Sequence, residues 1–379
     1  MVPSDGRCSY TLGNALFQAL TTGLTMTPRI TVAIPAFRRT EYLNSALESV
    51  LNQESKFEFE VILTLSRTEY EVPTRLLRKA EEKSVRFRLI DLGDCPVRRG
   101  ESMLSIARAA RGDILAILDD DDTWLPGKIL RLEEAFAEHA RLAYFHNGQD
   151  FIDASGRQLP PFSLHRSIRH PSSMARQGFS TIIDAWDEVA FRSSLQYELG
   201  FNNSSIGISR SLLLDAASQL AKVSGGEDGF LFCLGAARGR ILYMTTDHLT
   251  GFRIHPSNTS SPQKGTSGTS EALASRYRQF VQDQELLGLA QLYRSLLPVN
   301  APGHFRAWID RDQAVRIALF AAAGGDLPGT RHASMIRALL DTDALVPLAR
   351  EIGCAVLLMG AACARKPTLL FFMSLRKLG

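Results

Sequence analysis

The sequence predicts an α/β fold, a mostly parallel β-sheet with helices on both faces, followed by a helical region. Short apolar runs rich in β-branched residues alternate with stretches whose apolar residues recur at helical spacing. One such run, 114–118, leads directly into four consecutive aspartates. Because ligands bind at the carboxyl ends of the strands in open α/β sheets, we expect the functional site near these aspartates.

Length and composition limit the classes of protein to consider. The chain has 379 residues, enough for one large domain and an appendage, and 45% of them are hydrophobic. A formal net charge of +3 argues neither for nor against nucleic acid, and we expect none as a partner. The 5 cysteines are widely spaced without a C-x-x-C pair, which favours reduced thiols, a cytoplasmic location and no zinc site. We expect a poorly ordered extension at 1–27, a main domain at 28–260 and a helical region at 261–379.

The expected elements begin with a β-branched run at Ile30–Ile34, which we expect to end at Pro35. A helix follows, with apolar positions from Leu43 to Leu51 at helical spacing. Further strands are expected at 60–65, 85–92, 114–118, 142–145, 203–209 and 241–244, and further helices around 76–80, 103–110, 129–136, 212–216 and from 230. Beyond a Ser/Gly/Thr-rich stretch, the spacing predicts only helices, around 273–281, 286–296, 308–320 and 335–340. The irregular stretch 160–178, rich in Pro, Ser and basic residues, is interpreted as either a lid or a plain insertion.

The four aspartates, Asp119 to Asp122, are the first group of residues that carries chemistry. Adjacent carboxylates repel one another, so folding them together is costly unless a cation neutralises them. Oxygen-only ligands suit Mg²⁺ or Mn²⁺. The alternative is a solvated acidic turn, but the apolar strand before the run and the Thr-Trp-Leu-Pro after it favour a site.

A second group is the pair Glu227 and Asp228, with two glycines before it and one after. Glycines let the backbone bring the carboxylates close to a ligand. A carboxylate in such a place can act as a general base. The alternative is an acidic pair that is favoured only by the dipole at the start of a helix.

Several segments together resemble one known family. The segment Gly112–Trp124, which contains the four aspartates, resembles the nucleotide-sugar segment of family 2 glycosyltransferases of the GT-A fold. The stretch 32–53, the Glu227-Asp228 pair and the R-x-H-x-x-N-x-S spacing that starts at Arg253 resemble the same family. The resemblance covers most of the main domain and none of the last third specifically, and it implies a GT-A nucleotide-diphospho-sugar transferase fold with a helical C-terminal appendage.

The resemblance implies a divalent cation, Mg²⁺ or Mn²⁺, as cofactor. Asp119 and Asp121 occupy the two positions of the family's D-x-D motif, and the register is ambiguous by one because all four residues are Asp. His255 lies where a histidine of the family can reach the metal or the diphosphate, and a purely structural role for it is equally open.

The resemblance also implies a nucleoside diphosphate sugar as donor. At Ser66 the family usually has an aspartate-rich turn, so the Ser-Arg-Thr-Glu of this chain puts the identity of the base in doubt. Arg99 could meet phosphate or be a solvated loop arginine. The residues expected to contact the donor are Pro35, Ala36, Phe37, Arg39, Ser66, Arg99, Asp119 and Asp120.

For the acceptor, the resemblance makes Asp228 the general base toward a hydroxyl and gives Glu227 the role of orienting the substrate. The implied reaction is transfer of a sugar by in-line displacement with inversion. A lipid-linked or cell-surface glycan precursor is one option for the acceptor. Two other hypotheses are a catalytically silent nucleotide-sugar-binding scaffold and a metal-dependent nucleotidyltransferase. The chain has no P-loop motif, and the Glu227-Asp228 pair speaks against a silent scaffold.

The C-terminal stretch 352–379 is apolar but interrupted by basic residues, and neither of its apolar runs has the ~18 to 20 residues that a spanning helix needs. We interpret it either as a helix packed on the helical region or as an in-plane anchor with basic residues toward anionic lipid. The second interpretation places the protein at the inner face of the cell membrane as a peripheral protein.

Overall fold

The computed structural model describes residues 29–94, 97–160, 178–195, 199–255, 258, 282, 285 and 288–322. Its strands are β1 (Ile30–Phe37), β2 (Phe59–Ser66), β3 (Arg86–Asp91), β4 (Ile114–Ile117), β5 (Thr123–Trp124), β6 (Leu142–Ile152), β7 (Gln158–Leu159), β8 (Ser180–Asp184), β9 (Ile206–Ser209) and β10 (Ile241–Arg253). Its helices are α1 (Leu43–Leu51), α2 (Thr74–Glu82), α3 (Arg99–Ala109), α4 (Lys128–Glu138), α6 (Glu188–Ser194), α7 (Arg210–Asp215), α8 (Ala217–Leu220), α9 (Glu227–Leu234), α11 (Leu289–Leu296) and α12 (Gly303–Ala322). Two short turns complete the list, the 3₁₀ turn η4 (Asn203–Ser205) and the π-helical turn η5 (Gly235–Gly239).

One sheet organises the fold. Its strand order is β3-β2-β1-β4-β9-β6-β10-β5, with β7 paired to β6 and β8 paired to β10. The strands β3, β2, β1 and β4 run parallel, as do β6 and β10, whereas β9 lies antiparallel between β4 and β6. The predicted α/β architecture with a mostly parallel sheet is therefore confirmed.

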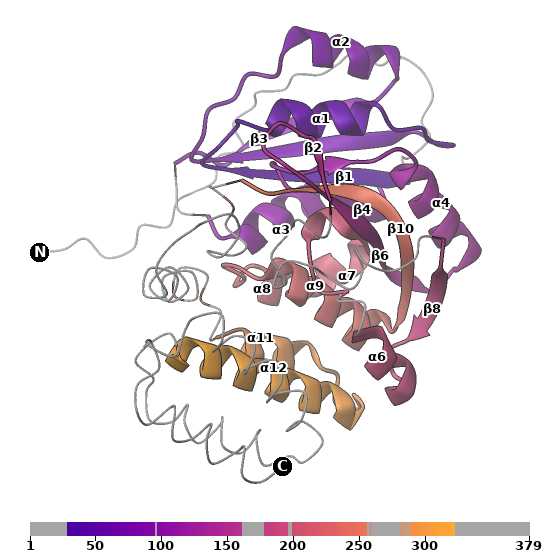
Figure 1. Cartoon of the computed structure of the whole chain (residues 1–379), viewed down its shortest axis with the longest axis vertical. Helices are drawn as coiled ribbons and strands as arrows, with labels where there is room; N and C mark the ends of the chain where they lie inside the picture. The colour runs from indigo at the N-terminus through magenta and orange to yellow at the C-terminus, as the bar shows by residue number, and fades with distance from the viewer. Residues whose placement is uncertain are drawn as a thin grey trace, which may run out of the picture. The chain divides into compact units, whose positions relative to one another are not determined.

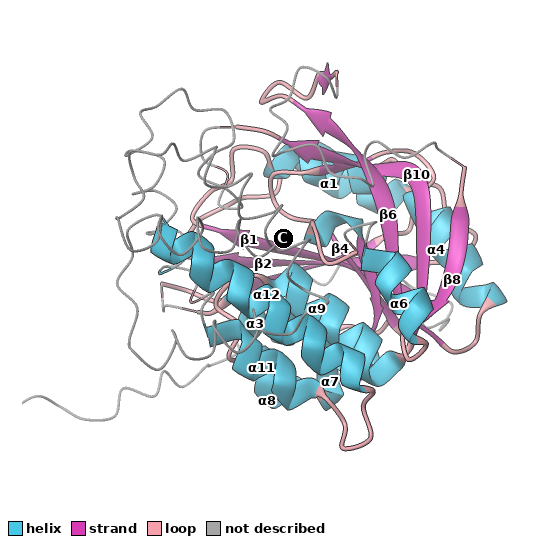
Figure 2. Ribbon diagram, turned by 60° about the horizontal axis from the view of Figure 1, so that its bottom comes forward, coloured by secondary structure: helices cyan, strands magenta, loops and turns pink. Residues whose placement is uncertain are grey.

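Helices cover both faces of this sheet (Figures 1 and 2). On one face, Val32 and Val61 of adjacent strands form a single apolar cluster with Leu47 of α1 and Leu132 of α4. The residues that alternate with these along each strand, such as Ile62 after Val61 in β2, point to the opposite face. There α3 packs against β1 and β2, and α7 and α8 pack against α3. Burial on both faces explains why these strands are continuous apolar runs in the sequence.

The first strand does not end at Pro35 as expected. It continues to Phe37, and Pro35 is paired with Thr64 of β2. Proline cannot donate a backbone hydrogen bond, so it is tolerated only where no partner needs that N–H. The neighbour on the other side, β4, is paired with β1 only as far as Ala33, whose carbonyl accepts from the N–H of Leu118 at 3.0 Å. The missing N–H of Pro35 therefore falls beyond the end of β4.

Two strands are longer than the sequence predicts, and the elements β5, β7, β8 and α6 were not predicted. The strand expected at 142–145 continues to Ile152, and the one expected at 241–244 continues to Arg253. Most of the extra residues of β6 before Phe151 are polar, which is typical of a loop, but side chains such as those of His146 and Asn147 are buried and hydrogen bonded. The strand β8 and the helix α6 follow the stretch 160–178 without a clear periodic pattern.

Contacts divide the chain into two units. The first comprises the residues up to Val223 together with Glu227–Arg253, and the second comprises Ser224–Gly226 and the residues from Ile254 onward. In the second unit the helices α11 and α12 pair, with Tyr293 stacked on Trp308 at 6.2 Å between ring centroids. These two helices match the expectations around 286–296 and 308–320.

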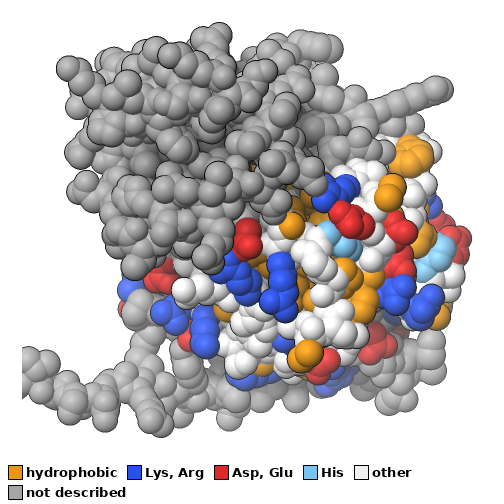
Figure 3. All heavy atoms as spheres, turned by 90° about the horizontal axis from the view of Figure 1, so that it is seen from below, with side chains coloured by type: hydrophobic (Ala, Val, Ile, Leu, Met, Phe, Trp, Pro, Cys, Tyr) orange, Lys and Arg blue, Asp and Glu red, His pale blue; other side chains and the backbone are white. Residues whose placement is uncertain are grey.

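Other expectations fall outside the described residues. They are the extension 1–27, the stretch 161–177, the helices around 273–281 and 335–340, and the tail 352–379. Among the described residues, no helix combines the length and apolarity that crossing a membrane requires. On the coloured part of the face in Figure 3, Lys and Arg side chains lie among acidic and uncharged ones, in keeping with the net charge of +3.

Candidate active site

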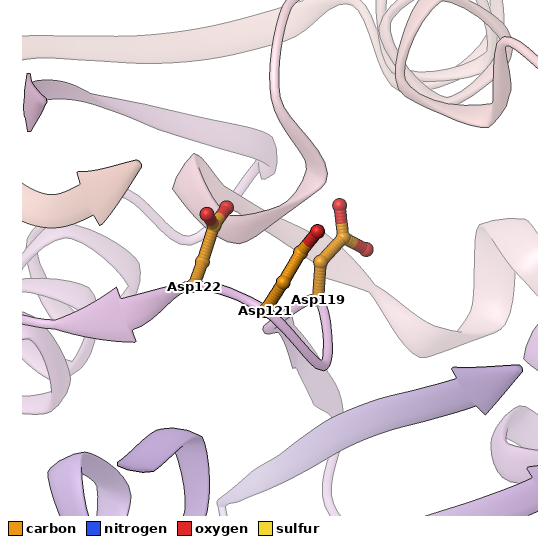
Figure 4. Close-up of side chains that lie close together, drawn as sticks. All are labelled: Asp119, Asp121 and Asp122. Carbon is orange, nitrogen blue, oxygen red and sulfur yellow. The ribbon is translucent and has the colours of Figure 1, made fainter. Parts of the chain in front are cut away.

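The acidic run lies directly after β4, at the carboxyl end of the parallel strands. Carboxylate oxygens of Asp119, Asp121 and Asp122 lie within 4.8 Å of one another. Figure 4 shows the three side chains projecting to the same side of the loop. In the part of the chain that is described, this is the one group of three or more residues with the geometry to hold a metal ion. We call these three residues the aspartate cluster.

The turn that precedes β9 holds the aspartate cluster in place. Ser204 is fully buried, and its hydroxyl donates to Oδ2 of Asp122 at 2.7 Å while accepting from the backbone N–H of Asp119 at 3.0 Å. The side-chain amide of Asn203 donates to Oδ1 of Asp119 at 3.3 Å. The position of two of the three carboxylates therefore depends on side chains more than 80 residues further along the chain.

Asp120 is not part of the aspartate cluster, and it binds other groups. It accepts from the backbone N–H of Phe37 at 3.3 Å, and from Nε and Nη2 of Arg39 at 3.1 and 2.8 Å. Nη2 of Arg39 also donates to Oδ2 of Asp121. The ambiguity of one residue in the acidic run is thereby reduced, because the structure brings Asp119 and Asp121 together and directs Asp120 toward β1.

Without a cation, the charged forms of Asp119 and Asp120 are disfavoured in this site. Burial raises the pKa of Asp119 well above its usual range, and the charges of Asp121 and Asp122 raise it further, while Arg99 opposes the shift. Burial and the charge of Asp121 also raise the pKa of Asp120, to about 6, against the effect of Arg39. A group whose charged form is disfavoured by burial and by like charges gains most from a bound cation.

The second predicted group, Glu227 and Asp228, lies at the start of α9. Oε1 of Glu227 accepts from Nη1 of Arg99, the first residue of α3, at 2.9 Å. The charge of Glu227 raises the pKa of Arg99 above its usual range. Oδ2 of Asp228 accepts from the backbone N–H of Asn202 at 3.1 Å, and its Oδ1 accepts from the N–H of Gly229 at 2.8 Å. Both acidic residues are thus held by specific donors.

Asn202 links the two groups of acidic residues. Its backbone N–H binds Asp228, while its side-chain oxygen accepts from the N–H of Ser204 at 2.9 Å. Its amide nitrogen donates to Oε1 of Gln149 on β6 at 2.8 Å. Asn202 has a positive φ of 67°, a conformation that Asn adopts more readily than most residues. The segment 202–205, which we call the Asn-Ser turn, therefore contacts the aspartate cluster and Asp228 at once.

The resemblance to the family places the stretch 203–209 near the acceptor, but no residue of the Asn-Ser turn, nor Arg253, was expected to contact the acidic residues. Arg253 is buried, and its backbone N–H donates to Oδ1 of Asp122 at 2.8 Å while its Nε donates to the carbonyl of Asp121 at 2.7 Å. Its guanidinium lies 4.7 Å from the ring centroid of Tyr42. The signals available in the sequence were four consecutive polar residues, 202–205, directly before the strand β9, and Arg253 at the end of β10.

The remaining predicted donor residues lie at the same edge of the sheet. Pro35, Ala36 and Phe37 form the carboxyl end of β1, and Ser66 ends β2 in register with Phe37. Ser66 is buried, and its hydroxyl makes no hydrogen bond to any described atom. His255 belongs to the second unit, where its N–H donates to Oδ1 of Asn258 at 2.6 Å. Its role as a metal ligand stays a prediction.

Comparisons with known proteins agree with the fold described above. Residues 31–195 match the family model of glycosyl transferase family 2. An uncharacterized glycosyltransferase of Methanocaldococcus jannaschii, MJ1057, is 30% identical over 145 residues, which are 36% of this chain and 46% of that protein. The chain thus matches about half the length of this relative.

Two solved structures are similar in fold. The mannosyltransferase PcManGT from Pyrobaculum calidifontis, in complex with GDP-Man and Mn²⁺, has a TM-score of 0.50 and 16% identity, over 93% of this chain and 85% of the other. Residues 1–349 of TarS from S. aureus give a TM-score of 0.48 and 14% identity, over 85% and 83% of the two chains. At such identities the first likeness shows the fold alone.

The fold is that of GT-A glycosyltransferases, with a site of clustered acidic residues at the carboxyl edge of the sheet. Residues 31–195 match the model of glycosyl transferase family 2, as the sequence motifs led us to expect.

Proposed function

We propose that the protein transfers a sugar from a nucleoside diphosphate sugar to an acceptor hydroxyl. The observation that carries this proposal is the Asn-Ser turn, which holds the aspartate cluster and Asp228 together by direct hydrogen bonds. A transferase needs a place for the leaving diphosphate and a base for the incoming hydroxyl close to each other. A silent scaffold would have no need to fix Asp228 beside the donor site.

The aspartate cluster fits a divalent cation. Its three carboxylates supply only oxygen ligands, they lie close together, and burial together with mutual repulsion disfavours their charged forms. This donor set suits Mg²⁺ or Mn²⁺. Asp119 and Asp121, with Asp122 as a third ligand, would hold the ion, whose chemistry is to act as a Lewis acid on the leaving diphosphate. The Mn²⁺ bound by the mannosyltransferase of similar fold supports this assignment.

For the donor we propose the edge formed by the ends of β1 and β2 and the start of α3. The backbone at Pro35, Ala36 and Phe37 and the buried hydroxyl of Ser66 would meet the nucleoside. Arg39 and Arg99 would meet phosphate there, and each is held by a carboxylate.

For the acceptor, Asp228 would remove the proton of the attacking hydroxyl, and the Arg99–Glu227 ion pair would keep the start of α9 in position. Attack by the hydroxyl on the face opposite the leaving diphosphate inverts the configuration at the anomeric carbon. We propose a lipid-linked or cell-surface glycan precursor as the acceptor, since the apolar and basic residues at 352–379 suit contact with anionic lipid.

The experiment that tests this function is incubation of the full chain with a panel of nucleotide sugars, with Mn²⁺, Mg²⁺ or a chelator. We expect release of nucleoside diphosphate from one donor, enhanced by an acceptor and abolished by the chelator. Binding of a nucleotide sugar without any release would instead identify a silent scaffold. Release of pyrophosphate from a nucleoside triphosphate would identify a nucleotidyltransferase.

A further inference from the structure

Arg39 makes an unusual set of contacts with the acidic run. It follows β1 and binds two carboxylates, Asp120 through Nε and Nη2, and Asp121 through Nη2. Both carboxylates are almost fully buried, while 23% of the arginine side chain is exposed. A forked guanidinium between two buried carboxylates is a strong, oriented interaction.

One of these two carboxylates also belongs to the aspartate cluster. Oxygens of Asp121 lie within 4.8 Å of those of Asp119 and Asp122, and Oδ2 of Asp121 accepts from Arg39. The same carboxylate therefore serves an internal cation and the site where the proposed metal ion would bind. Its negative charge attracts both, and each cation repels the other.

We propose that Arg39 is an internal counter-cation that competes with the divalent ion for Asp121, and so weakens the metal affinity of the site when no donor is bound. The inference rests on the proposed function. When the ion binds, Asp121 gives up part of its interaction with Arg39, and the guanidinium, still paired with Asp120, becomes available to an anionic group of the donor. Metal and nucleotide would then bind cooperatively, because the diphosphate offers Arg39 a new partner.

The physical sign of the effect follows from charge. Removing the positive charge of Arg39 removes a repulsion on the incoming ion and a partner that the ion must displace. Coulomb energies between charges a few ångströms apart are large in partly buried sites, so we expect Arg39→Gln to bind Mn²⁺ alone about tenfold more tightly than the unaltered protein. The cooperativity between Mn²⁺ and a nucleoside diphosphate should decrease in the same variant.

A neighbouring arginine provides a matched control. Arg38 carries the same charge one residue earlier, but its guanidinium lies over the ring of Phe37, 4.8 Å from the ring centroid. The variant Arg38→Gln therefore changes the net charge equally without removing a contact to the acidic run. We expect its Mn²⁺ affinity to be within about twofold of the unaltered protein, since exposed charges are largely screened.

The experiment is a calorimetric titration of Mn²⁺ into the full chain without nucleotide, then with uridine or guanosine diphosphate, for the unaltered protein, Arg39→Gln, Arg39→Lys, Arg38→Gln and Asp121→Asn. Thermal unfolding with and without Mn²⁺ gives a second readout. The melting temperature of Arg39→Gln should rise more with Mn²⁺ than that of the unaltered protein, because at one ligand concentration a tighter ligand stabilises the folded state more. Arg39→Lys keeps the positive charge but loses the forked guanidinium, so its Mn²⁺ affinity should lie between those of the unaltered protein and Arg39→Gln.

The outcomes separate this inference from the function on which it rests. Weaker or unchanged Mn²⁺ binding by Arg39→Gln, with binding lost in Asp121→Asn, would overturn the role of Arg39 and leave the metal site standing. Equal Mn²⁺ binding by Asp121→Asn and the unaltered protein would overturn the metal site and this inference together. If Arg39→Gln does not fold, an Mn²⁺ affinity of Arg39→Lys equal to or below that of the unaltered protein overturns the inference.

Discussion

Among single residues, Asp228 has the most demanding role proposed here. A sugar hydroxyl becomes a good nucleophile only while its proton is being removed. Both oxygens of Asp228 accept backbone N–H groups, from Asn202 and Gly229, and these bonds hold the carboxylate in one orientation. Its neighbour Glu227 is occupied by Arg99. In the proposed function the two acidic residues would therefore have separate tasks: Asp228 would take the proton, and Glu227 would fix the position of α9.

We expect Asp228→Asn to lower kcat roughly 10² to 10⁴-fold, because asparagine keeps the shape and can accept a hydrogen bond but cannot take the proton. Donor affinity should be preserved, and titration of the donor into the variant checks this. The control is Asp91→Asn, an exposed aspartate whose carboxylate also accepts a backbone N–H. Turnover by Asp228→Asn within a few-fold of the unaltered protein would mean that another residue is the base.

The sequence was sufficient to predict the residues of the acidic run and the Glu227-Asp228 pair, because each is a short motif of adjacent residues. It was insufficient for the contacts that give them their environment. Arg99 and Glu227 are 128 positions apart, and Arg39 and Asp120 are 81 apart. Such pairs are set by the order of the strands in the sheet, and nothing in the local pattern of either partner identifies the other.

At the scale of elements, the Asn-Ser turn is the feature that joins the parts of the site. Its helical turn η4 ends where β9 begins, and β9 inserts antiparallel between β4 and β6. This insertion brings Ser204 to the end of β4, where the acidic run starts. Lys128 of α4 also reaches the turn, since its Nζ donates to the carbonyl of Ser205 at 3.0 Å. Several elements thus fix one short segment.

The turn offers a paired test. Ser204→Ala removes the donor to Asp122 and the acceptor of the Asp119 N–H, both in a buried place, and should lower the free energy of unfolding by about 1–3 kcal/mol. The Mn²⁺ affinity should fall as the aspartate cluster loses its support. Ser205 is equally buried in the same turn, but its hydroxyl makes only a long contact, 3.4 Å to Oγ1 of Thr250.

Ser205→Ala should therefore keep the Mn²⁺ affinity and lose less stability than Ser204→Ala. Denaturant unfolding and calorimetric titration measure the two quantities. If both variants lose Mn²⁺ affinity equally, the turn acts through its general packing and the specific hydrogen bonds of Ser204 are unimportant.

Element boundaries were harder to predict than element types. The apolar cores of β1, β2, β3 and β4 gave strands at the expected places. The polar ends of β6 and β10 were missed, because the sequence does not show which residues will hydrogen bond to a polar run such as that from His146 to Asp150. In the fold, His146 bonds the carbonyl of Phe201 and Asp150 bonds His248. Hydrogen bonds to distant residues therefore stabilise strand structure in residues that are typical of loops.

At the scale of the whole molecule, stability should depend on pH through His146. Burial lowers the pKa of this histidine from 6.5 to about 4. The unfolded chain therefore takes up a proton near pH 6.5, whereas the folded protein does so only near pH 4. Over this window protonation of His146 favours the unfolded state, so the contribution of this residue to the free energy of unfolding should decrease as the pH falls, by at most about 1.4 kcal/mol for each pH unit. The raised pKa of Asp120 acts in the opposite direction, and it does so equally in a variant of His146.

The variant His146→Gln isolates this effect, since its amide can still donate to the carbonyl of Phe201 but does not titrate. Denaturant unfolding between pH 7 and pH 4 should give a flatter curve for the variant. The carboxylate of Asp153 does not interfere, because the hydroxyl of Ser155 and other donors lower its pKa to about 2 and confine its own effect to more acidic solutions. Parallel curves for the two proteins would show that His146 is protonated in both states or in neither.

The last prediction concerns where the molecule works. The stretch 352–379 lies outside the described residues, and its sequence combines apolar side chains with four cations, Arg365, Lys366, Arg376 and Lys377. If it lies in the headgroup region, each cation contributes about 1 kcal/mol toward anionic lipid, and this contribution weakens with salt. A lipid-linked acceptor would then be delivered to Asp228 from the membrane surface.

Co-sedimentation with anionic and with neutral liposomes tests this for the full chain, for a chain ending at Glu351, and for a full chain with the four cations replaced by Ser. We expect the full chain to pellet with anionic liposomes at low salt, and both altered chains to pellet less. The version with Ser keeps the apolar side chains, so it separates the electrostatic share from the apolar one. Equal, negligible pelleting of all three would favour a helix packed within the protein, and a soluble acceptor would then be the better hypothesis.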